Sequence, residues 1–188
     1  MTMKVTETKV MSLEISELRD FDPIRVVTEN YGPGRGRITI TCEGKAWTGS
    51  WFAMSDRSVE QFFCDCGNDY LVNCMAGNVS SEIDNDNEAN MRFMFSEVLR
   101  LRREGELSKD QARVCWEEID GSDDIKSTVC AYSSVISEVP YFSTEPWYLP
   151  WPTVPNPVFI RLNSMFDIVR AALQQHLALA GQSEETIA

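Results

Sequence analysis

Apolar and polar residues alternate along the first quarter of the chain, as they do in half-buried β-strands. Four segments carry this pattern: Leu13 to Leu18, Ile24 to Thr28, Arg37 to Cys42 and Lys45 to Phe52. The turn-forming sequences Gly32-Pro-Gly-Arg-Gly36 and Glu43-Gly44 separate the last three of them. Residues 1–54 are therefore predicted to form an antiparallel β-meander of three or four strands.

The spacing of apolar residues lengthens to that of a helix after Ser55. One short helix is expected through Val59 and Phe63, and a second one around Leu71. A longer helix is predicted from about Asn87 to Arg103, ended by Gly105.

A second long helix follows after a short connection. Ser108 and Gln111 have the spacing of a capping box, in which each side chain accepts a hydrogen bond from the other residue's backbone amide. The box opens a helix through Ile119. The sequence thus predicts a central helical hairpin.

The last third of the chain contains three kinds of segment. Thr128 to Val139 is predicted to hold a strand. Six of the eight prolines lie between Pro140 and Pro157, interleaved with aromatic residues, so we expect an irregular strap over the core or over a partner. Leu162 to Leu177 has the apolar face of an amphipathic helix of about 18 residues, with fraying expected from Gly181.

These elements define an α+β protein. The 188 residues are predicted to form a single domain over 1–188, with a β-sheet in 1–54, helices in 55–120, and the strap and C-terminal helix in 121–188. A chain of this length buries a core without disulfides or metal.

The net charge of the chain is strongly negative and unevenly distributed along the sequence, which limits the partners that the chain is expected to bind. Lys and Arg number 17 against 29 Asp and Glu, a net charge of −12, and residues 51–150 carry 11 of those net charges. Such a charge argues against direct binding to nucleic acid, an anionic membrane or a phosphate-rich substrate. The argument is weaker for the neutral first 50 residues, whose turn carries Arg35 and Arg37.

The chain is expected to lie in the cytoplasm. Residues 1–10 lack the apolar run of a signal peptide, and no later segment has the length of a membrane span. The six cysteines are accordingly interpreted as reduced thiols.

Two acidic clusters flank the predicted hairpin. They comprise Glu82, Asp84, Asp86 and Glu88, and then Glu117, Glu118, Asp120, Asp123 and Asp124. Carboxylates on a rigid scaffold can imitate a nucleic-acid backbone and occupy the cationic groove of a DNA- or RNA-handling protein. The alternative is that these acids serve solubility only.

The strap offers a second candidate contact surface. Trp147, Tyr148 and Trp151 belong to the residue types most enriched at binding hot spots. They are candidate partner-binding residues if the strap is exposed.

The cysteines allow a zinc hypothesis. Cys42, Cys64, Cys66 and Cys74 could offer four thiolates. However, the Cys64-Asp-Cys66 spacing on a helix points the two sulfurs apart, whereas zinc knuckles space their cysteines by two to four residues. We expect no cofactor, and keep a cysteine-based zinc protein or small enzyme as the alternative function.

Few other residues suggest catalysis. His176 is the only histidine, and no Gly-x-Ser-x-Gly elbow accompanies it. Asp84-Asn-Asp86 begins like a calcium loop, but Ala89 stands where that loop needs glycine and Phe95 where it needs glutamate. A non-enzymatic role is therefore favoured.

A family resemblance gives these features a context. Tyr31-Gly-Pro-Gly-Arg-Gly-Arg-Ile-Thr-Ile-Thr-Cys42, and the segment from Asp56 through Cys64 to Leu71, resemble a family of small accessory proteins of bacteriophages and prophages. The similarity covers about residues 20–120, and it supplies no catalytic residues. It implies a protein that binds and disables a host defence or nucleic-acid-processing protein. The expected partner is a host protein with a cationic surface, and a homodimer stays open.

Overall fold

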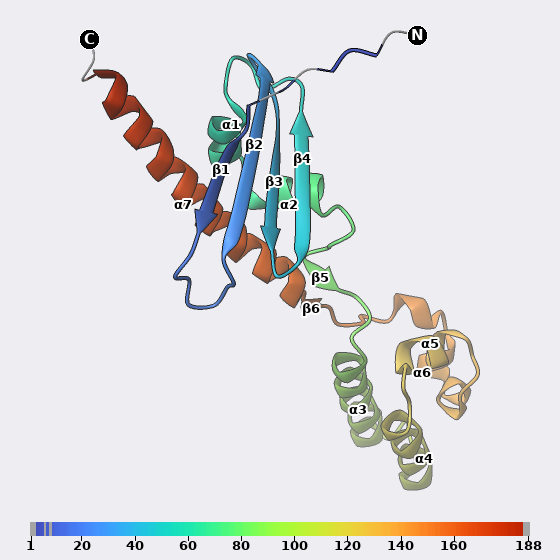
Figure 1. The fold of residues 1–188 in the computed structure, drawn as a ribbon. Helices are drawn as coiled ribbons and strands as arrows, with labels where there is room; N and C mark the ends of the chain where they lie inside the picture. Colours follow the sequence, from blue (N-terminus) through green and yellow to red (C-terminus); the bar gives the residue numbers. More distant parts are fainter. Residues whose placement is uncertain (1–2, 6, 8, 186–188) are drawn as a thin grey trace. The chain divides into compact units, whose positions relative to one another are not determined.

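The computed structural model describes residues 3–5, 7 and 9–185, and its contacts divide the chain into two compact units (Figure 1). The sheet unit comprises Met1–Ser80 with Pro157–Ala188, and the helical unit comprises Ser81–Asn156. The strap therefore falls in one unit and the C-terminal helix in the other. That the two units make up one domain stays a prediction.

The sheet unit contains the predicted meander. Its strands are β1 (Met11–Ile15), β2 (Ile24–Gly32), β3 (Arg35–Cys42) and β4 (Lys45–Trp51), in the order β1-β2-β3-β4, each antiparallel to the next. Side chains alternate between a buried and an exposed face, as the period of two requires. Ile38 and Ile40 are buried, while Arg37 is exposed and Thr39 half-buried on the opposite face.

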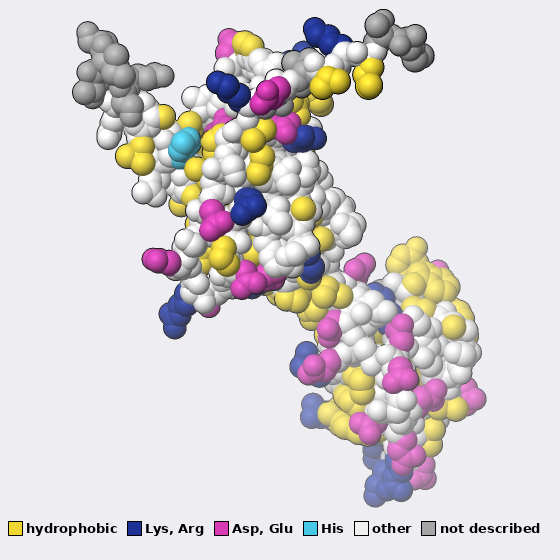
Figure 2. Space-filling model, in the orientation of Figure 1, with side chains coloured by type: hydrophobic (Ala, Val, Ile, Leu, Met, Phe, Trp, Pro, Cys, Tyr) yellow, Lys and Arg dark blue, Asp and Glu magenta, His cyan; other side chains and the backbone are white. Residues whose placement is uncertain are grey.

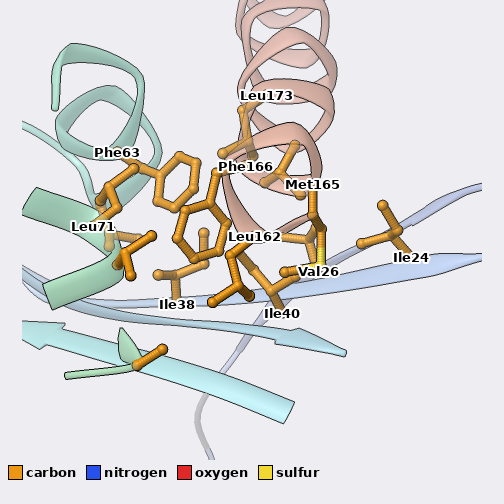
Figure 3. Close-up of a cluster of buried hydrophobic side chains, with 14 of the residues drawn as sticks. Ile24, Val26, Ile38, Ile40, Phe63, Leu71, Leu162, Met165, Phe166 and Leu173 are labelled. Atoms are coloured by element: carbon orange, nitrogen blue, oxygen red, sulfur yellow. The ribbon is translucent and has the colours of Figure 1, made fainter. Parts of the chain in front are cut away.

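Three helices cover the buried face of the sheet: α1 (Val59–Asp65), α2 (Asn68–Met75) and α7 (Pro157–Glu185) (Figure 1). Figure 3 shows their apolar side chains meeting those of the strands. Phe63 of α1 and Phe166 of α7 are fully buried and pack edge to face, with ring centres 5.8 Å apart. The core of this unit therefore joins segments about 100 residues apart in sequence.

The C-terminal helix is longer than predicted. It has 29 residues and continues through Gly181 to Glu185, where fraying was expected. Leu162, Phe166, Val169 and Leu173 form its buried stripe. A stripe of buried residues marks where a helix is covered, and the helical hydrogen bonds continue past the covered part.

A buried carboxylate joins α1 to the sheet. Glu60 accepts hydrogen bonds from the Thr28 hydroxyl and, at 3.0 and 3.1 Å, from the side-chain amide of Asn30. The side-chain amide oxygen of Asn30 in turn accepts the backbone N–H of Val59 at 2.8 Å. Burial alone would raise the pKa of Glu60, but these hydrogen bonds hold it below its ordinary value.

Glu60→Gln is expected to destabilise the protein by about 2 kcal/mol at pH 7, because one end of the amide would present a donor to the Asn30 donor. Since the pKa of Glu60 is lowered in the folded state, its stabilisation is complete above the unfolded pKa of about 4.3 and is lost as the pH falls through the lower folded pKa. Urea unfolding at several pH values should show the two proteins converging in acid.

The matched control for this variant is Glu88→Gln. Glu88 is exposed and pairs with Arg92 one helical turn away, at 2.8 Å. Such a pair contributes only about 0.5 kcal/mol or less. Equal effects of the two substitutions would contradict the assignment of Glu60 as a structural anchor.

The helical unit begins with the predicted hairpin of α3 (Asn87–Glu104) and α4 (Lys109–Asp120). Gly105 ends α3 with a left-handed φ of +83°, and both hydrogen bonds of the predicted capping box at Ser108 are present. The unit continues with α5 (Ile125–Cys130), η1 (Val135–Glu138), α6 (Pro140–Ser143) and η2 (Pro146–Tyr148). A short ladder of β5 (Glu82–Ile83) and β6 (Val154–Pro155) joins its two ends.

The prediction of a strand within Thr128 to Val139 is wrong. Residues Ile125–Cys130 form α5 instead, and η1 follows. Asp124 caps the helix by accepting the backbone N–H of Ser127 at 3.0 Å, and Ile125 and Val129, one turn apart, are both fully buried. The cap and the i,i+4 pair outweigh the β-propensity of Thr128 and Val129, which is the weaker signal.

The strap forms short helical turns that begin at prolines. Pro140 and Pro146 each begin a helix of only three or four residues, where a missing amide hydrogen costs nothing. Phe142 is fully buried in a core that it shares with α3, α4 and α5. The segment therefore folds over the core of its own unit, and the α+β prediction as a whole is confirmed.

Candidate partner-binding surface

Two of the candidate acids cap helices of the helical unit. Asp86 accepts the backbone N–H of Ala89 at 2.8 Å at the start of α3. Asp124 does the same for α5 and also accepts the Ser127 hydroxyl at 2.7 Å and the Asn85 amide. Hydrogen bonds from the Ser127 amide and hydroxyl hold the pKa of Asp124 below its ordinary value. Both side chains therefore have a structural role already.

Three other candidate acids have partners within their own unit. Glu82 accepts the hydroxyl of Thr153 at 2.7 Å, and Glu88 pairs with Arg92. Glu118 accepts the backbone N–H of Val135 at 3.1 Å and so supports the start of η1. A partner protein would compete with these contacts for the same oxygens.

The remaining four acids are available. Asp84, Glu117, Asp120 and Asp123 are exposed. Among the described residues, no hydrogen bond or ion pair engages their carboxylates. The structure thus divides the nine candidates into five whose carboxylates have partners within the helical unit and four that face solvent with no partner among the described residues.

The strap exposes two of its three candidate aromatic residues. Trp147 is 52% exposed and Tyr148 is 76% exposed, with ring centres 6.3 Å apart. Tyr132, which lies just after α5, is 48% exposed and meets the ring of Trp147 edge to face at 6.0 Å. We call these three residues the aromatic patch.

Tyr132 did not emerge as a candidate from the sequence, because a strand was predicted there. The signal that could have identified it is the helical pattern of Asp124, Ile125 and Val129, which ends α5 at Cys130. Residues that follow the end of a helix lie at the surface where the chain turns. The chain turns at Tyr132, whose φ is left-handed at +54°.

Trp151 helps to hold the turn that carries Trp147. It is half-buried and packs edge to face on Phe93 at 5.4 Å. Its indole N–H donates a hydrogen bond to the carbonyl oxygen of Pro146 at 2.8 Å, which fixes the turn that carries Trp147. The residue before that proline, Glu145, also has a left-handed φ, of +51°. Left-handed conformations of residues other than glycine cost free energy and persist only where surrounding contacts impose them.

The patch belongs to the more acidic of the two units. Residues 81–156 contain 7 Lys and Arg against 15 Asp and Glu, a net charge of −8. Figure 2 shows acidic side chains spread over the surface of this unit with hydrophobic side chains among them, and basic side chains mainly at its left and lower margins. The surface therefore combines exposed aromatic rings with a negative field.

The four cysteines considered for zinc are not assembled into a binding site. Cys42 is buried, Cys64 and Cys66 are half-buried, and Cys74 is exposed. Burial raises the pKa of Cys42, Cys64 and Cys66, which favours the thiol over the thiolate that zinc requires. Within the described part of the chain, no group of three or more His, Cys, Asp or Glu side chains is placed to hold a metal ion.

The two arginines of the glycine-rich turn lie on the exposed face of the sheet. Arg37 pairs with Glu29 at 2.8 Å, and the Arg35 guanidinium lies 5.6 Å from the centre of the Phe52 ring. Hydrogen bonding to Arg37 lowers the pKa of Glu29. Arg37 is therefore paired with an acid, whereas Arg35 has no ion pair among the described residues.

None of the helices that the structure describes has an apolar stretch sufficient to cross a bilayer.

Comparison with known proteins places the chain among phage proteins. The family model Phage_phiTE_072, described as a phage family, matches residues 3–175. The match includes residues 20–120, which carry the resemblance to phage accessory proteins, and extends over the strap and most of α7. No curated protein and no solved structure matches the chain.

Proposed function

The chain belongs to this phage family, and we propose that it works in the host cytoplasm by binding a host protein through the aromatic patch and the acidic surface of the helical unit. The host protein has a cationic surface of the kind that binds nucleic acid. Binding would inhibit or modulate that protein, which acts in host defence or nucleic-acid processing.

One observation carries this proposal: the exposure of Tyr132, Trp147 and Tyr148 side by side. Exposed clusters of large apolar side chains are uncommon on proteins that have no partner, and tyrosine and tryptophan dominate binding hot spots. The patch is also held in place by the Trp151–Pro146 hydrogen bond, so little conformational freedom is lost on binding.

The aromatic rings of the patch and the net charge of the helical unit favour a cationic partner. The faces of aromatic rings attract arginine and lysine side chains. Four exposed carboxylates of the same unit are without partners among the described residues, and the net charge of the unit is −8. These charges would speed the approach of a positive surface and repel acidic proteins.

Paired capture from a lysate of the host bacterium tests the proposal. Wild-type protein and Trp147→Ala serve as baits, and the retained proteins are identified by mass spectrometry. We expect a protein with a cationic surface that the wild type retains and the variant loses. If the wild type and Trp147→Ala retain the same proteins, the patch is not the contact surface.

Charge neutralisation is expected to slow association with that partner. A quadruple variant, Asp84→Asn, Glu117→Gln, Asp120→Asn and Asp123→Asn, should lower the association rate about tenfold at low salt and flatten its dependence on ionic strength, because exposed charges act mainly through steering. Stopped-flow or surface-based kinetics at several salt concentrations would measure this.

The matched control changes the net charge equally in the sheet unit, by Asp20→Asn, Asp22→Asn, Asp56→Asn and Asp69→Asn. All four residues are exposed. The control should keep most of the association rate. Equal slowing by both quadruple variants would mean that only the total charge matters and that the helical unit has no special role.

A further inference from the structure

The sheet unit contains an apolar cavity at the end of the β3–β4 hairpin. Its volume is about 220 Å³, and it lies against the first turns of α7. Buried side chains of Cys42, Leu162 and Met165 line it, together with the half-buried rings of Phe21 and Trp47. An apolar cavity of about 150 Å³ holds benzene, so this one has room for a substituted aromatic ring.

Charged groups lie around this cavity. Arg161 forms an ion pair with Glu43, donates to the backbone oxygen of Asp20 at 3.4 Å, and lies with its guanidinium 4.3 Å from the centre of the Phe21 ring. These three contacts fix its position. Lys45, also exposed and lining the cavity, has no ion pair among the described residues. The charged residues lining the cavity thus carry a net charge of +1 in a protein of net −12.

We propose that this cavity binds a small organic anion, formed by one aromatic ring or a branched apolar group that bears a single acidic substituent. The apolar part contacts Cys42, Trp47 and Met165, and the acidic group lies near Lys45 and Arg161. The partner surface of the helical unit plays no part in this site, so the two proposals stand independently.

The lining chemistry favours an anion over a neutral or cationic ligand. An apolar interior binds the ring through burial of its surface. An acidic group gains charge-assisted hydrogen bonds from a lysine and a preorganised arginine, whereas an ammonium group would meet like charge. Burial raises the pKa of the Cys42 thiol, so the interior stays uncharged at neutral pH.

The binding of three closely related probes would test this assignment. Titrations of the full chain with 3-phenylpropionate, 3-phenylpropionamide and 2-phenylethylammonium, followed by amide chemical shifts, should give saturable binding of the carboxylate with a Kd of roughly 0.1–1 mM. The amide should bind about five- to tenfold more weakly and the ammonium more weakly still. Absence of saturable binding, or equal affinity for the carboxylate and the amide, would overturn the proposal.

Two variants separate the charged and apolar parts of the site. Lys45→Gln should weaken binding of the carboxylate about fivefold and leave the amide unchanged. Val158→Trp, at an exposed position that lines the cavity, should fill it and abolish binding of both probes. Lys109→Gln, on α4, is the control and should change neither affinity. Binding that survives Val158→Trp would place the ligand elsewhere and refute the assignment.

Discussion

Trp147→Ala is expected to weaken binding of the proposed host partner at least about 30-fold, which corresponds to about 2 kcal/mol. Trp147 is the central ring of the aromatic patch, because it contacts the rings of both Tyr132 and Tyr148. Its removal would delete the largest contact and leave both neighbours without support. Tyr148→Ala should have a smaller effect, about fivefold to tenfold, because that ring lies at the edge of the patch. Calorimetric titration with the captured partner would measure both.

The matched control is Trp116→Ala. Trp116 is a tryptophan of the same unit, 40% exposed, whose ring packs on Phe95 at 4.2 Å and lies outside the patch. Its replacement should change the affinity for the proposed host partner by no more than about twofold relative to the wild type. Thermal unfolding of all the variants would show that the fold is retained, since partly exposed side chains contribute less to stability than buried ones. If Trp116→Ala weakened binding as strongly as Trp147→Ala, the aromatic patch would lose its assigned role.

Gly34→Ala is expected to lower the free energy of unfolding by about 4 kcal/mol or to prevent folding. Gly34 has a left-handed φ of +66°, and a Cβ atom there would lie 1.7 Å from the backbone oxygen of Ser55. The Gly34 carbonyl oxygen also accepts the backbone N–H of Met54 at 2.8 Å. The clash therefore involves two backbone segments that are held together and cannot separate cheaply.

Gly44→Ala provides a control with the same backbone demand and no clash. Gly44 has a φ of +72°, but no described atom beyond Gly44 and its two chain neighbours lies within 4 Å of where its Cβ would be. Gly44→Ala should therefore lower the free energy of unfolding by about 1 kcal/mol, which is the strain of placing an alanine in the left-handed conformation. Urea unfolding of both variants would measure the difference. Similar losses for both would mean that the β2–β3 turn tolerates displacement from Ser55.

Elements set by neighbouring residues could be predicted from the sequence. The capping box of Ser108 and Gln111 and the stop at Gly105 involve contacts over a few residues, so their pattern is visible in the chain. The alternation in β3 likewise reveals which face is buried. The strand predicted over Thr128 to Val139 failed because β-branched residues are only a weak guide to a strand.

The candidate surface could be predicted only in part. Counting acids located the negative charge in the middle of the chain, but it could not tell capping carboxylates such as Asp86 and Asp124 from unengaged ones such as Asp120. Likewise, residue type pointed equally to Trp147 and Trp151, although only the first is largely exposed. Whether an acid caps a helix depends on which backbone amides lie near it in space, and whether an aromatic ring is exposed depends on which side chains cover it.

The sequence by itself determined the α+β class, the meander, the helical hairpin, the acidic character and the resemblance to phage proteins, because periodicity, caps and composition are local or additive properties. The tertiary structure decided which residues share a core. It joined α7 to the N-terminal sheet through Phe63 and Phe166, folded the strap over the hairpin, and brought Tyr132 beside Trp147. These contacts depend on how apolar surfaces far apart in the chain cover one another, and no spacing of residues records that choice.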